Sequence, residues 1–362
     1  MALHRVSNPQ NPFISESREW LEAVPETRVE IYEERAKSIL SENDSPDIPF
    51  RWSVNPYRGC QHGCAYCYAR PTHEYLGFGA GSDFETRIVA KVNAPQLLEK
   101  ALSRRGWLGE SVTFSGVTDC YQPAEATYAL TRGCLEVCLR RQNPVGIVTR
   151  GRMVLRDADL LAELSRVAGA RVFMSIPFAS DADARAIEPF APPPSKRFET
   201  LEALCDAGVD VGVMVAPLIP ALNDMQIPEI LKRSAEAGAV SAAYIPLRLP
   251  RSVAPVFFER LEATMPHRAQ RVASLVGAMR GGRVSEARFG HRMQGVGPHW
   301  ESVKSLFEIA CDRYGLSVHK SEGFSKKSSH PDRGDSGSLT PLRIAPRKRT
   351  DSAQLTFDFG AE

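Results

Sequence analysis

Residues 55–70 read NPYRGCQHGCAYCYAR and place three cysteines, Cys60, Cys64 and Cys67, within a single short segment. A closed metal site normally has four protein ligands, and no fourth cysteine follows nearby. The C-x3-C-x2-C spacing therefore indicates a site with three protein ligands and one position left for something else.

An iron–sulfur cluster is the metal group that this segment fits best. Cysteine thiolates hold such clusters, and three of them on one loop match three irons of a [4Fe–4S] cube, which leaves the fourth iron open to a small molecule. Gly59 and Gly63 beside the cysteines give the backbone the freedom that wrapping a compact object requires. Zinc is the alternative, with His62 or His73 as fourth ligand, although structural zinc loops usually pair two separate C-x2-C knuckles.

Outward from this loop, short β-rich runs alternate with helical patterns between residues 50 and 250. The predicted strands are 51–57, 111–116, 145–150, 171–176, 209–217 and 240–249, and the predicted helices are 94–105, 124–142, 155–168, 181–188, 196–207 and 227–237. Apolar strands that alternate with helices predict a parallel sheet covered by helices. Six units with polar motifs at the strand ends favour a partial (β/α)6 TIM-like barrel over a doubly wound sheet.

The rest of the chain divides by composition. Residues 1–50 are predicted to be an N-terminal extension whose amphipathic segment packs on the outside of the core, residues 51–250. Residues 251–318 are predicted to be a helical C-terminal extension. Residues 319–362 are basic, rich in Ser, Pro and Gly, and predicted to be disordered.

The composition indicates the cellular compartment of the protein but does not identify a binding partner. The formal net charge is +2 over 362 residues, which by itself names no partner. Eight cysteines in a chain of this length are too few for a disulfide scaffold, and three clustered ones indicate metal in a reducing compartment. No apolar run approaches the ~18 residues of a membrane span, and the first residues lack the apolar region of a signal peptide. We therefore expect a cytoplasmic protein without a membrane partner.

The cysteine loop, with Tyr66 just before its last cysteine and at the end of the first strand of a β/α chain, resembles that of the radical S-adenosylmethionine (SAM) superfamily. The resemblance covers roughly residues 50–250. It implies that Cys60, Cys64 and Cys67 ligate a [4Fe–4S] cluster and that SAM chelates the open iron. It also implies that an electron from a flavodoxin- or ferredoxin-type donor cleaves SAM to methionine and a 5′-deoxyadenosyl radical, which takes hydrogen from a substrate.

The same resemblance implies SAM contacts in the segment FSGVTDCYQPAE (114–125), which follows the second predicted strand. The family binds the amino group of SAM there, and the residues in that place are Ser115, Gly116, Val117, Thr118 and Asp119. The segment departs from the common Gly-Gly-Glu form, so the contacting atom is left open. An ordinary strand-end turn, with Asp119 capping a helix, is the alternative.

Further SAM contacts are expected at other strand ends and in the cysteine loop. The resemblance implies that Tyr66 neighbours the adenosyl group and that Ser175 contacts the ribose or carboxylate. It also implies that Val215 or Ala216 packs near adenine, and a plain core strand is the alternative for this pair. Arg150 and Arg248 end the third and sixth predicted strands. Either guanidinium can pair with a carboxylate or a phosphate, and an ordinary surface arginine is the alternative.

A narrower resemblance rests on six motifs that extend it to about residue 315. NPYRGCQHGCAYCYAR, SGVTDCYQPAE, LTRGCLEVC, NPVGIVTRG, LRDADLLAEL and GVMVAPLIPALND together resemble the spore photoproduct lyase-like proteins, often labelled DNA repair photolyases. The resemblance implies repair of a thymine dimer lesion by hydrogen abstraction, bond scission and hydrogen return from a cysteine. Cys120 is the candidate donor, although it does not align residue by residue, and a buried turn cysteine is the alternative. Packing is expected for Cys134, Cys138, Cys205 and Cys311.

The tail carries two further expectations. Residues 319–350 form a basic arm suited to phosphate contacts, with a solubilising tail as the alternative. The segment QLTFDF (354–359) resembles the short peptide by which bacterial replication and repair proteins bind the sliding clamp, and docking onto the chain's own domain is the alternative.

Three functions remain in competition. The first is a radical SAM enzyme acting on nucleic acid, with lyase-type repair of a pyrimidine lesion as its specific form. The second is a radical SAM enzyme acting on a peptide, an RNA or a small metabolite. The third is a cluster- or zinc-bearing binding protein without radical chemistry.

Overall fold

The computed structural model describes residues 28–318, which belong to one compact unit of the chain. The predicted disordered tail, its basic arm and the clamp-like peptide lie outside the described residues, as does the first half of the N-terminal extension. Those expectations stay predictions.

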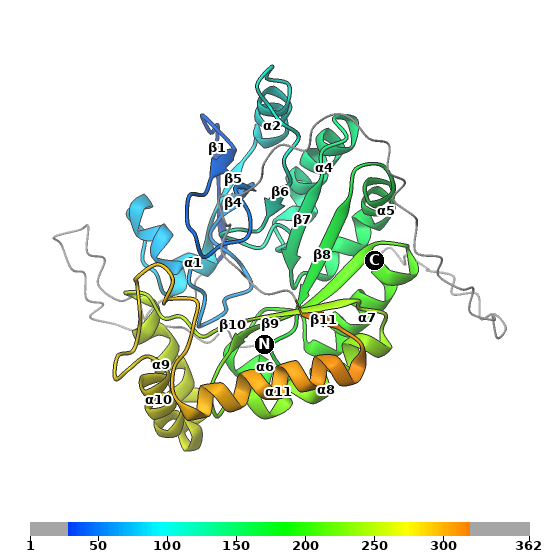
Figure 1. The fold of residues 1–362 in the computed structure, drawn as a ribbon. Coiled ribbons are helices and arrows are strands. Elements are labelled where there is room, and N and C mark those ends of the chain that lie inside the picture. Colours follow the sequence, from blue (N-terminus) through cyan, green and yellow to red (C-terminus); the bar gives the residue numbers. More distant parts are fainter. Residues whose placement is uncertain (1–27, 319–362) are drawn as a thin grey trace, which may run out of the picture. The chain divides into compact units, whose positions relative to one another are not determined.

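The core of the described unit is a curved sheet of eight strands in the order β11-β10-β9-β8-β7-β6-β3-β2 (Figure 1). Six of them run parallel in chain order: β3 (Trp52–Val54), β6 (Val112–Phe114), β7 (Val145–Thr149), β8 (Ala170–Ser175), β9 (Asp210–Leu218) and β10 (Ser241–Pro246). Within residues 28–318, β3 pairs with β2 and β6 but not with β10, so the barrel is open. The predicted partial (β/α)6 barrel is confirmed.

Alternation along the strands gives the sheet two faces. In β9, Val211, Val213 and Val215 are buried, whereas Met214 and Ala216, on either side of Val215, are partly exposed. Successive side chains of a strand point to opposite faces, so one face carries the apolar row under the helices and the other lines the barrel interior. The parallel register places Ser175 of β8 beside Met214 of β9, which puts both on the interior face.

Helices cover the outer face of the sheet. They are α2 (Ala94–Leu102), α3 (Glu125–Tyr128), α4 (Leu130–Arg140), α5 (Ala158–Val167), α6 (Asp181–Ile187), α7 (Pro194–Asp206) and α8 (Ile227–Glu236), and Figure 1 shows α4, α5, α7 and α8 outside the strands. Gly169, Gly208 and Gly238 follow α5, α7 and α8 with positive φ, because a helix that turns directly back into a strand needs a left-handed residue there.

The C-terminal extension is helical, as expected. It consists of α9 (Val253–Thr264), α10 (Pro266–Met279) and α11 (Pro298–Tyr314), followed by the short strand β11 (Ser317–Val318), which pairs parallel with β10. Helix α11 packs along α8 and buries Trp300 and Phe307 against Tyr244 of β10. No helix among residues 28–318 is long and apolar enough to cross a membrane.

A second, three-stranded sheet was not expected. It has the order β1-β5-β4, with β1 (Glu30–Glu34), β5 (Arg87–Lys91) and β4 (Tyr57–Arg58), and β2 (Leu40–Glu42) joins the main sheet antiparallel to β3. The short elements α1 (Ser82–Thr86) and η1 (Arg70–Leu76) complete this region. Because β4 ends two residues before Cys60, the small sheet anchors the start of the cysteine loop.

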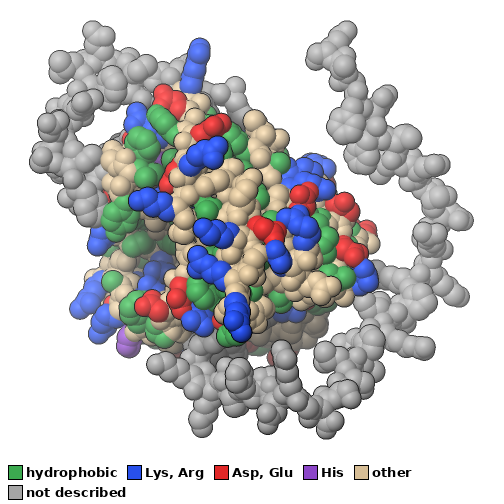
Figure 2. All heavy atoms as spheres, turned by 90° about the horizontal axis from the view of Figure 1, so that it is seen from above, with side chains coloured by type: hydrophobic (Ala, Val, Ile, Leu, Met, Phe, Trp, Pro, Cys, Tyr) green, Lys and Arg blue, Asp and Glu red, His purple; other side chains and the backbone are tan. Residues whose placement is uncertain are grey.

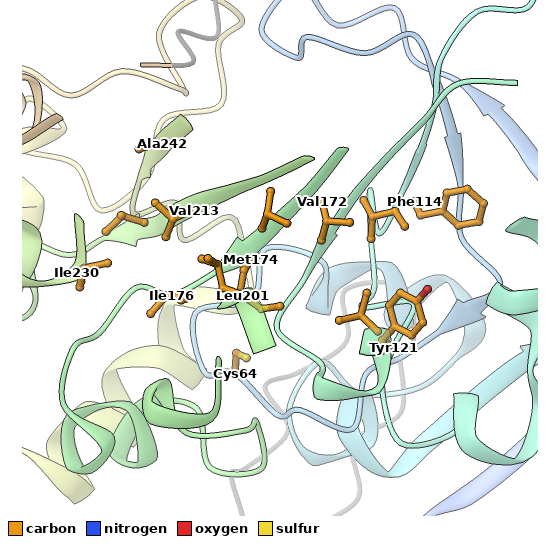
Figure 3. Close-up of a cluster of buried hydrophobic side chains, with 14 of the residues drawn as sticks. Cys64, Phe114, Tyr121, Val172, Met174, Ile176, Leu201, Val213, Ile230 and Ala242 are labelled. Atoms are coloured by element: carbon orange, nitrogen blue, oxygen red, sulfur yellow. The ribbon is translucent and has the colours of Figure 1, made fainter. Parts of the chain in front are cut away.

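The main hydrophobic core runs under the strands and reaches the cysteine loop. Figure 3 draws Cys64 with Met174, Ile176 and Leu201, and all four belong to one cluster of buried side chains. The first cysteine-bearing loop is therefore packed onto the barrel rather than projecting from it.

Candidate active site around the cysteine loop

The cysteine loop leaves β4 and is held by backbone hydrogen bonds at both ends. The Cys60 N–H donates to the Phe84 carbonyl at 2.8 Å, and the Ala65 N–H donates to the Ile187 carbonyl at 3.0 Å. Gly63 has a φ of +64°, and a Cβ there would lie 2.7 Å from Cδ2 of Phe190. The expectation that glycine is needed for close wrapping is confirmed at this position.

Arg70 holds the loop from within the protein. Its fully buried guanidinium donates to the carbonyls of Gly63 and Cys64, each at 3.0 Å, and forms an ion pair with Glu85 at 2.9 Å. Two more hydrogen bonds reach the carbonyls of Ala80 and Gly81. Since these carbonyls are buried, they need donors, and Arg70 supplies them from a single side chain. Sequence reasoning missed this role, although Arg70 is the last residue of the motif.

The three thiols lie at the edge of the core. Cys60 and Cys64 are buried, and Cys67 is partly exposed. Burial raises the pKa of all three thiols, to about 12 for Cys64, and the positive charge of Arg150 counteracts part of that rise at Cys64. Nη1 of Arg150 donates to Sγ of Cys64 at 2.8 Å, so the cation lies directly beside one predicted ligand.

The two histidines of the zinc alternative have other partners. Nε2 of His73 lies 2.8 Å from the Arg87 carbonyl, and Nδ1 of His62 lies 3.4 Å from Oδ2 of Asp119. Between residues 28 and 318 no three His, Cys, Asp or Glu side chains are grouped closely enough to hold one metal ion. A zinc ion needs every sulfur within about 2.3 Å of one point, whereas a cluster takes one thiolate at each of three corners. The donor set of three thiols fits a cluster that takes three protein ligands.

The segment after β6 is joined to the cysteine loop. Asn55 accepts from the Val117 N–H at 2.8 Å, and the hydroxyl of Thr118 donates to the Tyr57 carbonyl at 3.0 Å. Ser115 has a φ of +67°, and its hydroxyl accepts from the Cys120 N–H at 2.9 Å. The structure thus brings residues 115–119 next to the segment that leads into the cysteine loop.

Asp119 ties this segment to the end of β7. One oxygen accepts from the Thr149 hydroxyl at 2.6 Å and from the Tyr121 N–H at 2.9 Å, and the other accepts from the Arg150 N–H at 2.9 Å. Burial alone would raise the pKa of Asp119, but its hydrogen bonds, together with the nearby His62, hold the pKa well below its usual range. Asp119 is therefore a buried anion that fixes two strand ends, and it does not cap a helix.

Arg150 and Glu188 form a network at the strand ends that sequence reasoning only half anticipated. Nη1 of Arg150 donates to Oε1 of Glu188 at 2.6 Å and to the Tyr66 hydroxyl at 2.8 Å, and Nη2 donates to the Ser175 hydroxyl at 3.3 Å. The Tyr66 hydroxyl also donates to Glu188, and Arg197 pairs with the other oxygen of Glu188. Two predicted contacts, Tyr66 and Ser175, are thus in one network with Cys64.

The network carries more positive than negative charge. Burial alone would lower the pKa of Arg150, but its contacts with Cys64, Tyr66 and Glu188 raise it well above its usual value. Glu188 is buried, and burial would raise its pKa, yet Arg197 and Arg150 lower it. Two guanidiniums against one carboxylate leave a surplus cation beside the thiols. Sequence reasoning missed Glu188 and Arg197, because nothing in the local pattern marks residues that meet Tyr66 from more than a hundred positions away.

Other predicted residues lie in the core or apart from this network. Val215 is fully buried under the helices, whereas Ala216 is partly exposed on the interior face, so Ala216 is the better placed of that pair. Arg248 follows β10, and its guanidinium lies 6.0 Å from the ring centre of Tyr68. Cys120 is fully buried in the main core, which is the placement expected of a packed turn cysteine and gives no support to a hydrogen-donor role.

The remaining cysteines pack as expected. Cys134 and Cys138 of α4 and Cys311 of α11 are buried in the main core, and Cys205 of α7 packs against it.

Comparisons with known proteins agree with this geometry. A family model described as the radical SAM superfamily matches residues 54–233. An uncharacterised protein of Mycobacterium tuberculosis is 36% identical over 250 residues, which is 68% of this chain and 74% of the relative. An uncharacterised protein of Methanocaldococcus jannaschii is 30% identical over 200 residues, covering 55% of this chain and 72% of the relative.

The fold is also similar to that of solved structures. A spore photoproduct lyase variant with bound AdoMet and dinucleoside spore photoproduct superposes with a TM-score of 0.58 at 16% identity, covering 80% of each chain. Spore photoproduct lyase complexed with dinucleoside spore photoproduct gives the same TM-score at 15% identity, covering 80% of this chain and 81% of the other. At this level of identity the likeness concerns the fold.

Proposed function

The chain belongs to the radical SAM superfamily, whose members are enzymes that use SAM and a [4Fe–4S] cluster, and we propose that Cys60, Cys64 and Cys67 hold such a cluster here. The observation that carries the proposal is the placement of three thiols on one tightly held loop with a surplus cation beside Cys64. When bound, the cluster supplies the electron that cleaves SAM to methionine and a 5′-deoxyadenosyl radical.

The chain's own residues then serve to bind and orient. Arg150 is placed to donate to a carboxylate of SAM, because one arginine of its network is left without a matching acid. Ser175 is held at the strand end by Arg150, and Asp119 fixes the backbone of residues 115–119 against β7. Tyr66 is pinned through its hydroxyl, so its backbone is fixed next to Cys67 and beside the expected adenosyl position.

For the substrate, we propose a nucleic acid, with lyase-type repair of a pyrimidine lesion as the specific form. The fold likeness to spore photoproduct lyase, whose solved complexes hold a dinucleoside spore photoproduct, supports this choice. A peptide, an RNA or a small metabolite is the alternative, and a non-catalytic metal-binding protein is the least favoured. The electron donor is proposed to be of flavodoxin or ferredoxin type, and a cytoplasmic location is proposed with it.

SAM cleavage tests the function. The protein, reconstituted with iron and sulfide under anaerobic conditions and reduced with dithionite, should release 5′-deoxyadenosine and methionine from SAM. The Cys64→Ala variant should release neither, whereas Cys205→Ala, which changes a cysteine of α7 far along the chain from the loop, should match the wild type. A wild-type protein that holds four irons per chain and leaves SAM intact would refute the proposal.

A further inference from the structure

Arg248 is a cation without a matching acid. It follows β10 at the barrel opening and is partly buried, and among residues 28–318 it forms no ion pair. Its Nη1 donates to Sδ of Met293 at 3.4 Å, which is a weak acceptor, and its buried Nε has no hydrogen-bond partner in the described part of the chain. Burial and then the neighbouring Arg292 lower the pKa of Arg248, and Tyr68 and Asp47 only partly offset these two effects.

Two more arginines surround it. Arg280 is buried and donates to the backbone carbonyls of Leu247 at 2.5 Å and Gln294 at 2.6 Å, so it ties the loop before α11 to the end of β10. Arg292 pairs with Asp47 at 2.7 Å. The carboxylate of Glu286 acts on Arg280 through its negative charge, but it forms its ion pair with Arg288, at 2.9 Å.

Within residues 28–318, Asp47 is therefore the one carboxylate that forms an ion pair with any of these three arginines. Removing a charge from water is costly unless an opposite charge or hydrogen-bond acceptors replace the water. Arg280 has carbonyl acceptors and Arg292 has Asp47, whereas the one hydrogen-bond acceptor of Arg248 in the described part of the chain is a thioether. A guanidinium in these surroundings can bind an anionic ligand without first breaking an ion pair within the protein.

Aromatic rings flank this group of arginines. Tyr68, which is 49% exposed, lies under the guanidinium of Arg248, and its hydroxyl donates to the Gly116 carbonyl at 2.6 Å. Phe289, which is 58% exposed, lies 4.3 Å from the guanidinium of Arg292. Tyr68 directly follows Cys67, so the arginines adjoin the segments expected to hold the cluster and SAM. Exposed rings next to guanidiniums suit a nucleobase attached to a phosphate.

The face of the protein drawn in Figure 2 has no large basic patch that would bind a nucleic acid. Lys and Arg side chains are spread over that face with Asp and Glu side chains between them, rather than gathered in one patch. This face therefore shows no broad positive patch that would attract a polyanion.

We propose that Arg248, supported by Arg280 and Arg292, binds a backbone phosphate of a single-stranded nucleic acid and that Tyr68 stacks on an adjoining base. This inference rests on the proposed function, because it names the substrate class of the same site. It assigns the strand a fixed position across the carboxyl end of β10, next to the predicted cofactors.

Equilibrium binding of a fluorescent eight-nucleotide single-stranded DNA to the full-length protein tests the site, with no reductant present. Arg248→Gln should weaken binding roughly tenfold, and it should lower the slope of log K against log salt by about 0.7, the value for one phosphate contact on a single strand. The matched control is Arg271→Gln, which removes one exposed arginine from α10 and should leave both quantities unchanged. Thermal denaturation should show both variants folded.

An acidic octapeptide of Asp and Glu serves as the competing anion. If Arg248→Gln leaves DNA binding unchanged, or weakens peptide binding instead of DNA binding, the inference is overturned. Equal losses in the Arg248 and Arg271 variants would also overturn it, since they would indicate general charge attraction. SAM cleavage is measured separately, so a protein that cleaves SAM but binds DNA without using Arg248 refutes this inference and leaves the proposed function standing.

Discussion

Arg150 is the residue in which binding and electronic roles meet. Its Nη1 lies 2.8 Å from Sγ of Cys64, and the same guanidinium contacts Tyr66, Glu188 and Ser175. Hydrogen bonds to ligating sulfurs and nearby charge are among the factors that set cluster potentials. A cation at this distance from Cys64 would stabilise the reduced form of the proposed cluster, because that form carries one more negative charge.

Replacing this cation should change the potential of the reconstituted cluster. Arg150→Met is expected to lower the midpoint potential by about 60 mV, the equivalent of a tenfold change in a one-electron equilibrium. Arg150→Lys, which keeps the charge but not the fork of donors, should fall between the variant and the wild type. A potentiometric titration followed by electron paramagnetic resonance measures the shift, with Arg166→Met on the exposed face of α5 as control. Identical midpoints for Arg150→Met and the wild type would contradict the assignment.

Among the structural elements, the cysteine loop is held in its conformation by hydrogen bonds from Arg70, the last residue of its own motif. Arg70 supplies hydrogen bonds to four buried carbonyls and an ion pair to Glu85, whose pKa burial would otherwise raise further. Loss of the guanidinium would leave the buried carboxylate of Glu85 without its ion-pair partner and would remove one donor from each of the four carbonyls.

Arg70→Met is therefore expected to reduce the free energy of unfolding by about 3–5 kcal/mol, the usual cost of breaking one side of a buried ion pair. Urea denaturation of the cluster-free protein measures this, and the iron content after reconstitution should fall in parallel. The double variant Arg70→Met/Glu85→Gln should recover part of the loss, because it removes the stranded charge. The exposed control Arg166→Met should change stability by less than about 0.5 kcal/mol. A similarly small effect of Arg70→Met would show that other donors hold the loop.

The elements were predictable where the signal is local. A buried strand is marked by an apolar run of neighbouring residues, as in β7, β8 and β9, and a tight turn is marked by a glycine, as after α5, α7 and α8. All six parallel strands and their helices could therefore be predicted from the sequence. Strand β1, EIYEE, is mostly exposed and is held by backbone pairing with β5, so its side chains show no apolar alternation. The grouping of the three thiols could be predicted from the spacing of their cysteines. The hydrogen bond from Tyr66 to Glu188 could not, because it depends on the register of strands that are distant in the sequence.

At the scale of the whole molecule, the segment QLTFDF (354–359) lies outside the described residues and its role stays a prediction. We expect the full-length protein, but not a chain ending at residue 353, to be captured by purified bacterial sliding clamp, because the three apolar anchors of the segment would be lost. Leu355→Ala with Phe357→Ala in the full-length chain should abolish capture as well. SAM cleavage should be unchanged in both, since the barrel and the candidate active site lie within residues 28–318 and both changes lie outside them. Equal capture of the full-length and truncated chains would exclude the clamp.

The proposed function requires a cluster with three cysteine ligands and one iron left open for SAM. The most direct measurement is the electron paramagnetic resonance spectrum of the reduced, reconstituted protein with and without SAM. We expect four irons per chain, a spectrum that changes when SAM is added, and no such signal from Cys64→Ala. A reduced cluster of four irons whose spectrum is the same with and without SAM would contradict it.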